Sequence, residues 1–266
     1  MKPHQIAALN PSLAIGAAIQ SLQPNSHSQG AQAKPEQRMP FTIRVVDDER
    51  ALRKAVNIRQ AAYGRHLPEL AEKMGAFEHA DLESGVVVLL AESKLDGASL
   101  GTMRIQNNRY QPLAVEHSVS LPDWLQGGTL AEATRLGVAG GQVGKVVKTM
   151  LFKAFFQYCI AQNIDWMVIT ARAPLDRQYE ALLFQDAFPG QGFMPMRHVG
   201  NLPHRVLALE VATAEARWQA AAHPLLGFMC ELHHPDLILN QQQKTVDGGM
   251  LKSGIRAGNA RHEYRS

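Results

Sequence analysis

Cysteine and long apolar runs are scarce in this sequence, and each shortage excludes a class of protein. Two cysteines cannot build the disulfide framework of a small secreted domain. Cys159 and Cys230 both stand in apolar surroundings, which predicts free buried thiols in a reducing cytoplasm. No apolar run approaches the roughly 18 to 20 residues that cross a bilayer. With 45% hydrophobic and 19% charged residues over 266 positions, the composition is typical of a soluble globular protein.

The chain also has little net charge, and its ends carry what there is. The formal charge is +3, of which residues 1–39 contribute +2 and residues 240–266 contribute +3, so residues 40–239 are acidic by −2. A basic surface that binds nucleic acid requires positive charge on the folded domain itself. We therefore expect no nucleic acid among the partners.

Composition divides the chain into four parts. Residues 1–40 become polar and rich in Pro, Ser, Gly and Gln after position 23, which predicts a flexible N-terminal segment. Within it, residues 5–22 are mildly apolar and lack the basic start of a signal peptide, so they allow only weak contact with a membrane surface. We expect a folded domain over 41–212, a helical extension over 213–239 and a disordered basic tail over 240–266.

The most informative stretch is a strand, a glycine turn and a helix in direct succession. Residues 129–138 read as a strand, three glycines follow at Gly140, Gly141 and Gly144, and residues 143–158 repeat apolar side chains at helical spacing. This order directs backbone N–H groups and the positive end of a helix at one point, which suits a phosphate-bearing ligand. The alternative is an ordinary strand–helix turn whose glycines allow tight packing.

Charged residues interrupt elements that should be buried. Glu132 and Arg135 lie in the apolar strand, where strict alternation puts them on opposite faces and a bulge would bring them to one side; the sequence leaves both open. Arg59 falls on the apolar stripe of a helix that Asp47 or Asp48 can cap, so it either extends to the solvent or pairs with a carboxylate in a cleft.

The element order predicts a mixed sheet with helices on both faces. This order over residues 41–211 resembles the GNAT acyltransferase superfamily and, within it, the N-acyl amino acid synthases and the autoinducer (acyl-homoserine lactone) synthases. Four features carry the resemblance: Arg59 on the first helix, an acidic pair before a strand (Glu78 and Asp81), Gly-x-x-Arg ending at Arg104, and Glu132-x-x-Arg135. The resemblance implies an α/β (α+β) fold, with a mostly antiparallel sheet that is splayed at its centre.

The resemblance also implies an activity, the transfer of a fatty acyl group from a thioester to the amine of an amino acid. Glu132 would be the base, with Arg135 opposing the rise of its pKa, and backbone N–H groups near Val138 would polarise the thioester carbonyl. Arg59 and Arg104 would hold the acceptor's carboxylate, oriented by Glu78 and Asp81. Trp166 would contact the acyl chain, with Leu136, Met150 and Phe155.

The glycine turn departs from the superfamily's pyrophosphate signature, because Lys145 stands where a glycine is expected. Gly140, Gly141 and Gly144 would then suit the single phosphodiester of acyl carrier protein better than coenzyme A. Lys145, Lys148, Arg197 and Arg205 could meet the acidic carrier surface, or merely be solvated.

No permanently bound cofactor or metal is expected, since His233, His234 and Asp236 lack a further ligand for zinc. The alternatives are an acetyl-coenzyme A acetyltransferase and a non-catalytic module that senses acyl groups.

Overall fold

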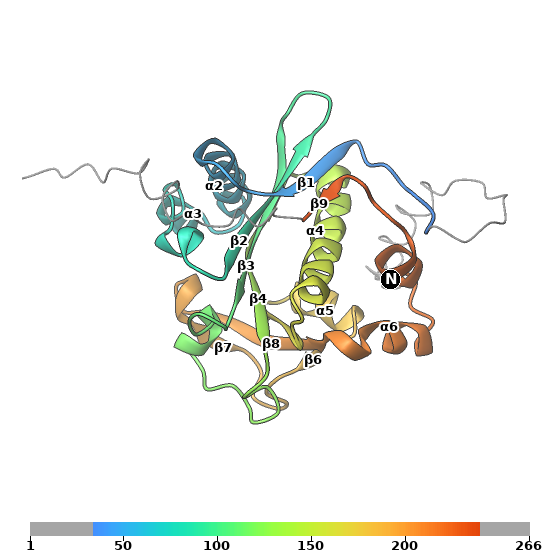
Figure 1. The fold of residues 1–266 in the computed structure, drawn as a ribbon. Coiled ribbons are helices and arrows are strands. Elements are labelled where there is room, and N and C mark those ends of the chain that lie inside the picture. Colours follow the sequence, from blue (N-terminus) through green and yellow to red (C-terminus); the bar gives the residue numbers. More distant parts are fainter. Residues whose placement is uncertain (1–33, 240–266) are drawn as a thin grey trace, which may run out of the picture.

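Residues 34–239 are described by the computed structural model, and a mixed sheet runs through the middle of them (Figure 1). Its strands follow the order β6-β8-β5-β4-β3-β2-β1-β9, with β7 paired to β8. Their bounds are β1 (Phe41–Val45), β2 (Val86–Ser93), β3 (Ser99–Asn107), β4 (Leu130–Val138), β5 (Trp166–Ala171), β6 (Gln185–Asp186), β7 (Met194–Met196), β8 (Leu202–Glu210) and β9 (Leu237–Ile238). The expected membrane contact of residues 5–22 and the expected disorder of 240–266 lie outside the described residues.

The sheet is mostly antiparallel, and its centre opens as the fold prediction requires. Only β4–β5 and β1–β9 are parallel pairs among the described strands. The β4–β5 pairing begins at Leu130↔Trp166 and ends at Ala133↔Ile169, although both strands continue beyond that point. The predicted mixed sheet with a splayed centre is therefore confirmed.

Helices cover both faces of the sheet (Figure 1). One face carries α2 (Glu49–Gly64) and α3 (Pro68–Lys73), and the other carries α4 (Gly141–Ala161), α5 (Asp176–Ala181) and α6 (Val211–Ala220). Short helical turns complete the fold: η1 (His79–Leu82), η2 (Ala114–His117), η3 (Arg197–Val199) and η4 (Gly227–Glu231). Asp48 caps α2, as expected, by accepting a hydrogen bond from the N–H of Ala51 at 2.7 Å.

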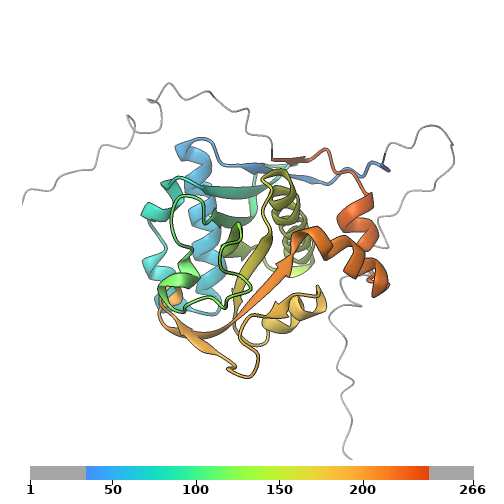
Figure 2. The ribbon, with the colours of Figure 1, turned by 60° about the horizontal axis from the view of Figure 1, so that its bottom comes forward.

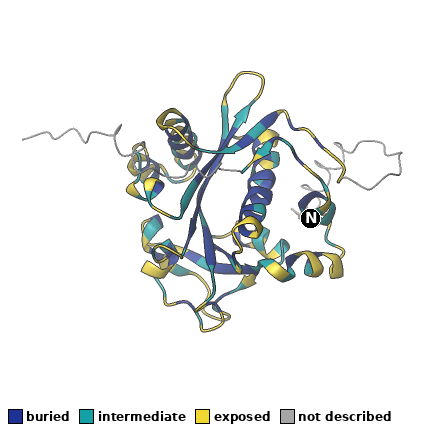
Figure 3. Ribbon diagram, in the orientation of Figure 1, coloured by how far each residue is buried: buried dark blue, intermediate teal, exposed yellow. Residues whose placement is uncertain are grey.

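Helix α4 and the central strands form the core, since both are buried along most of their length (Figure 3). Two glycines permit close packing there. A Cβ atom on Gly137 would stand 3.1 Å from the Cα of Arg59, so this glycine lets α2 approach β4. A Cβ atom on Gly144 would stand 1.8 Å from the carbonyl oxygen of Ala139. Gly144 is thus required by the turn that leads into α4.

The two ends of the described chain pack together, which corrects the boundary of the flexible segment. Residues 34–40 lie along residues 230–236: the N–H of Gln37 donates to the carbonyl of His233 at 2.8 Å, and Met39 donates to the carboxylate of Asp236 at 2.7 Å. The extension beyond 213 is also not wholly helical, because β9 joins the sheet edge beside β1. The sequence of residues 34–40 shows only that this segment is polar. The residues to which it hydrogen-bonds lie about two hundred positions later in the chain, so no local pattern predicts the contact.

A buried lysine holds the extension against α4, beside which α6 and residues 227–231 lie (Figure 2). The ammonium group of Lys153 donates to the carbonyls of Phe228 and Leu232 at 2.5 and 2.6 Å and lies 2.9 Å from Nδ1 of His234. His234 therefore has a structural partner. Between residues 34 and 239, no three His, Cys, Asp or Glu side chains are placed to hold a metal ion, and no helix is long and apolar enough to cross a membrane.

Gly144→Ala should destabilise the fold by about 3 kcal/mol, because the new methyl group must displace the Ala139 carbonyl. The free energy of unfolding in urea, followed by circular dichroism, measures this. Gly140→Ala is the matched control: Gly140 has φ −70° and no atom within 4 Å of an added Cβ, so its cost should stay below about 1 kcal/mol. Equal losses in the two variants would contradict the packing role of Gly144.

Candidate functional site

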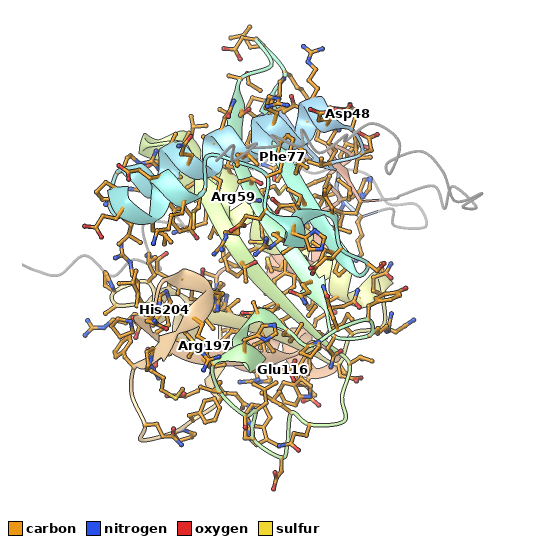
Figure 4. The ribbon with its side chains drawn as sticks, turned by 90° about the vertical axis from the view of Figure 1, so that its left-hand side faces the viewer. Asp48, Arg59, Phe77, Glu116, Arg197 and His204 are labelled. Carbon is orange, nitrogen blue, oxygen red and sulfur yellow. The ribbon has the colours of Figure 1, made fainter. Side chains whose placement is uncertain are left out.

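Five charged residues from four segments form one buried cluster between α2 and the sheet. Arg59 is fully buried and makes a bidentate contact with Asp81, with N–O distances of 2.9 and 3.0 Å. Arg104 donates to Glu78 at 3.0 Å, and Arg135 grips both oxygens of Glu78, at 2.7 and 2.8 Å. Figure 4 shows Arg59 on the inner side of α2. Of the two alternatives that the sequence left open for Arg59, the structure therefore shows the pairing with a carboxylate.

A β-bulge in β4 brings Arg135 to this cluster and resolves the alternative that the sequence leaves open. Thr102 pairs with Gly137 and Arg104 pairs with Thr134, so one residue of β3 faces two of β4, Arg135 and Leu136. Arg135 takes a left-handed backbone conformation, with φ 55°. The bulge turns its side chain to the face that already carries Arg104, so that Arg135 reaches Glu78.

The cluster is held in its charged form. Burial alone would raise the pKa of Glu78, but its hydrogen bonds to Arg135 and the charges of Arg135, Arg104 and Arg59 prevail and lower it to about 2. Three arginines face two carboxylates, which leaves one positive charge in excess. Arg59 and Arg104 pair with Glu78 and Asp81 and do not line the neighbouring cavity. The structure therefore places them behind the cavity wall, where they support the position of Glu78.

Glu132 lies on the same face of β4 but outside the cluster. It is fully buried, and its Oε2 accepts a hydrogen bond from the N–H of Val115 in η2 at 3.0 Å. Its Oε1 has no partner among residues 34–239. Burial raises its pKa from the ordinary 4.5 to about 7, against the opposing influence of the Val115 N–H and Arg104. Glu132 is thus a carboxyl group poised to exchange a proton near neutral pH, although it does not line the cavity.

A cleft of about 280 Å³ opens where β4 and β5 separate. Its walls come from Thr134–Val138 of β4, Thr170–Arg172 after the last β4–β5 pair, the end of α2, and η3. Four basic residues line it and no acidic one does, among the residues that the structure describes: Arg65, Arg135, Lys148 and Arg172. Leucine, valine and tyrosine side chains supply the rest of the surface, including Leu136, Tyr63 and Tyr179. The cleft therefore suits a ligand that is anionic at one point and apolar elsewhere.

Of the residues predicted to bind the phosphate or the acyl chain, Leu136 and Val138 line this cleft. Gly140, Gly141 and Lys145 are exposed at the N-terminus of α4, outside the cleft, and Gly144 is buried against Ala139. The first turn of α4 carries no acidic residue and no side-chain cap, so its N–H groups face the solvent.

Trp166 lies at the opposite, closed end of the β4–β5 pair. It pairs with Leu130 and its ring stacks edge-on against Trp124 at 4.9 Å between centroids. Trp166 does not line the cleft, so we do not retain it as an acyl contact. Arg205 does not offer a free positive charge to an acidic carrier protein, because its guanidinium group pairs with three carboxylates: Asp176, Glu180 and Asp186.

The structure adds two cleft residues to which the sequence analysis assigns no role. Nε2 of His198 lies 3.1 Å from Oγ1 of Thr170, and the backbone carbonyl of His198 accepts a hydrogen bond from Arg135 at 2.9 Å. No pattern in the sequence links His198 to Thr170, which lies twenty-eight positions earlier. Only the packing of η3 against the end of β5 brings the two together.

The fold resembles solved acyltransferases. FeeM, an N-acyl amino acid synthase from uncultured soil microbes, is 18% identical to this chain with a TM-score of 0.51, covering 66% of this chain and 93% of FeeM. BjaI, a CoA-dependent acyl-homoserine lactone synthase, is 15% identical with a TM-score of 0.49, over 73% of this chain and 93% of its own. No family model and no curated protein matches the sequence. At such identities the likeness shows the fold, which is that of the GNAT acyltransferases expected from the sequence.

Arg59→Met should lower the free energy of unfolding by about 3 to 5 kcal/mol, because it leaves Asp81 buried without its bidentate partner. Arg53→Met on the same helix is the control: Arg53 is largely exposed and pairs with Glu49, so it should cost at most about 1 kcal/mol. Urea denaturation at neutral pH measures both. Similar values for the two would show that the cluster contributes no more than a surface pair.

Glu132→Gln should make the protein more stable at pH 8 and leave its stability below pH 4.5 unchanged. The raised pKa of Glu132 means that the folded state keeps a proton that the unfolded chain releases above about 4.5, so wild type loses stability as pH rises towards and beyond 7. Glutamine does not titrate and should avoid this loss of roughly 3 kcal/mol. Urea midpoints from pH 4 to 8 measure the difference, and parallel pH profiles of variant and wild type would contradict it.

Proposed function

We propose that this protein is an N-acyltransferase that moves a fatty acyl group from an acyl thioester, chiefly acyl carrier protein, to the amine of an amino acid. The observation that carries the proposal is the cleft: it lies between the separated strands β4 and β5, its arginine and lysine residues face no acidic residue of the lining, and the rest of its wall is largely apolar. The fold that it shares with FeeM supports the reaction class. Soluble co-substrates suffice, so no resident cofactor is invoked.

Arg135 is the residue that we assign to the acceptor's carboxylate. It alone of the three clustered arginines lines the cleft. Glu78 and the carbonyl of His198 fix its guanidinium group through Nε, Nη1 and Nη2. The two terminal nitrogens carry four hydrogens, and these contacts leave some of them for a ligand. The excess positive charge of the cluster adds a second attraction for an anion.

The thioester carbonyl would meet backbone donors at the end of β4. The N–H of Ala139 bonds to the carbonyl of Leu100 on β3 at 2.8 Å. Because successive amides of an antiparallel strand point to alternate sides, the N–H of Val138 points away from β3 and towards the opening beside β5. Such an amide can stabilise negative charge that develops on the carbonyl oxygen.

Glu132 remains our candidate base. A pKa of about 7 matches proton transfer at neutral pH. Since Glu132 lies beneath η2 and does not line the cleft, the proton of the amine must reach it through an intervening group or a water molecule. The exposed N-terminus of α4, with Gly140, Gly141 and Lys145, is assigned to the donor's phosphate outside the cleft. Gly144 serves this segment only by shaping its turn.

The test is acylation of mixed amino acids with acyl carrier protein or coenzyme A thioesters of several chain lengths, followed by mass spectrometry. We expect N-acyl amino acids, formed fastest from acyl carrier protein. Tight binding of free coenzyme A together with acetyl transfer would favour the acetyltransferase alternative. Absence of transfer from every donor would favour the non-catalytic module. Glu132→Gln with near wild-type activity would remove Glu132 as the base.

Arg135→Gln identifies the carboxylate contact. It should raise KM for an amino acid by about 10- to 100-fold, which corresponds to the loss of one charge-assisted hydrogen bond to the carboxylate. It should change KM for the corresponding amino acid amide much less, because the amide carries no negative charge. Arg172→Gln, which alters another cleft cation outside the cluster, is the control and should not discriminate between the two acceptors. An equal rise for acid and amide would show that Arg135 only supports the fold.

A further inference from the structure

Thr170 occupies the point at which the central strands part. The last β4–β5 pair is Ala133↔Ile169, so Thr170 and Thr134 are the next residues on each strand and both line the cleft. The hydroxyl oxygen of Thr134 accepts a hydrogen bond from Nε of Arg104 at 3.1 Å, which holds this side chain against the charged cluster. The hydroxyl of Thr170 contacts His198 instead. It stands on the β5 side of the opening, level with Thr134 on β4.

His198 is a neutral imidazole with one orientation imposed on it. Burial, and then the charge of Arg135, lower its pKa to about 3, so it carries no charge at physiological pH. Its own backbone carbonyl accepts from Arg135 at 2.9 Å, which ties η3 to the charged cluster. The backbone of His198 is therefore tied to Arg135 of β4, while Nε2 of its ring lies next to Thr170 of β5.

The hydrogen on this imidazole can be placed from its surroundings. Nδ1 is buried and has no partner among residues 34–239, whereas Nε2 lies 3.1 Å from Thr170. A buried N–H donor without an acceptor is rarer in proteins than an acceptor with an unused lone pair. The hydrogen then belongs on Nε2, where it is donated to Oγ1 of Thr170. This direction leaves the hydroxyl hydrogen of Thr170 free to be donated elsewhere.

We infer that the Thr170 hydroxyl donates a hydrogen bond to the thioester carbonyl in the cleft, and that His198 is the positioning residue that turns this hydroxyl towards it. The inference rests on the proposed acyl transfer and assigns this contact to β5 in place of the Val138 amide, which lies four residues beyond Thr134 along β4. As the amine attacks, the carbonyl oxygen gains negative charge, and a hydroxyl already held in position by His198 stabilises that charge without rearranging. No covalent bond to Thr170 or His198 forms in this step.

The first test compares Thr170→Val and Thr170→Ser with wild type in acyl transfer. Removing an oxyanion donor should lower kcat by about 10²- to 10³-fold and leave KM for the thioester nearly unchanged, because the contact strengthens only in the transition state. Thr170→Ser keeps the hydroxyl and should retain most of the activity. Thr149→Val is the control, since Thr149 is a buried threonine in α4 outside the cleft, and it should keep wild-type kcat.

The second test asks whether His198 acts through Thr170. His198→Ala should lower kcat, and His198→Gln, whose amide N–H can replace Nε2–H, should recover part of the loss. The double variant Thr170→Val/His198→Ala should be no slower than Thr170→Val alone, since both changes remove one contact. Nitrogen NMR of the wild-type imidazole provides a readout without catalysis: we expect the hydrogen on Nε2.

The outcomes separate the two proposals. If wild type transfers no acyl group to any amine, the proposed function fails and this inference fails with it. If wild type is active but Thr170→Val keeps its kcat, or if NMR places the hydrogen on Nδ1, this inference alone is overturned. A loss in Thr170→Ser equal to that in Thr170→Val would also overturn it, because the hydroxyl would then be irrelevant.

Discussion

Two carboxylates, the buried Asp81 and the half-buried Glu78, hold three arginines, and the rest of the site depends on this interaction. Glu78 and Asp81 precede β2, and they neutralise charges that arrive from α2, β3 and β4. Without them, three guanidinium groups would be packed together in a low-dielectric space, which is very costly. The acidic pair therefore fixes where α2 sits on the sheet and fixes the direction of Arg135, and the shape of the cleft follows from both.

The cleft combines two deviations from a regular sheet. The bulge at Arg135 brings this arginine to the face of the sheet that carries the cluster, where it also lines the cleft, and the end of β4–β5 pairing at Ala133↔Ile169 creates the opening itself. A regular sheet would bury Arg135 on the wrong face and fill the gap with hydrogen bonds. Local irregularity in β4 thus supplies the charge that lines the cleft, and its separation from β5 supplies the space.

The C-terminal extension has a different task. Lys153, His234 and Asp236 link it to α4 and to residues 34–40, far from the cleft. Their burial and mutual hydrogen bonds explain these polar residues without any metal or catalytic role. These residues accordingly form a second polar cluster, separate from the one that builds the site, and it joins the extension to the edge of the sheet at β1 and β9.

The sequence by itself determined the order of elements, the amphipathic α2 and α4, and the presence of unbalanced charge in apolar segments, because periodicity and burial cost are local properties. It also indicated that Arg59 could pair with a carboxylate, and the resemblance implied that Glu78 and Asp81 orient Arg59 and Arg104. Tertiary structure decided that Arg135 joins this cluster and lines the cleft, since the bulge depends on the register between β3 and β4. It likewise decided that Gly144 serves packing, that Trp166 lies at the closed end, and that His198 reaches Thr170. Each of these is a contact between distant segments, whose energy no single stretch of sequence contains.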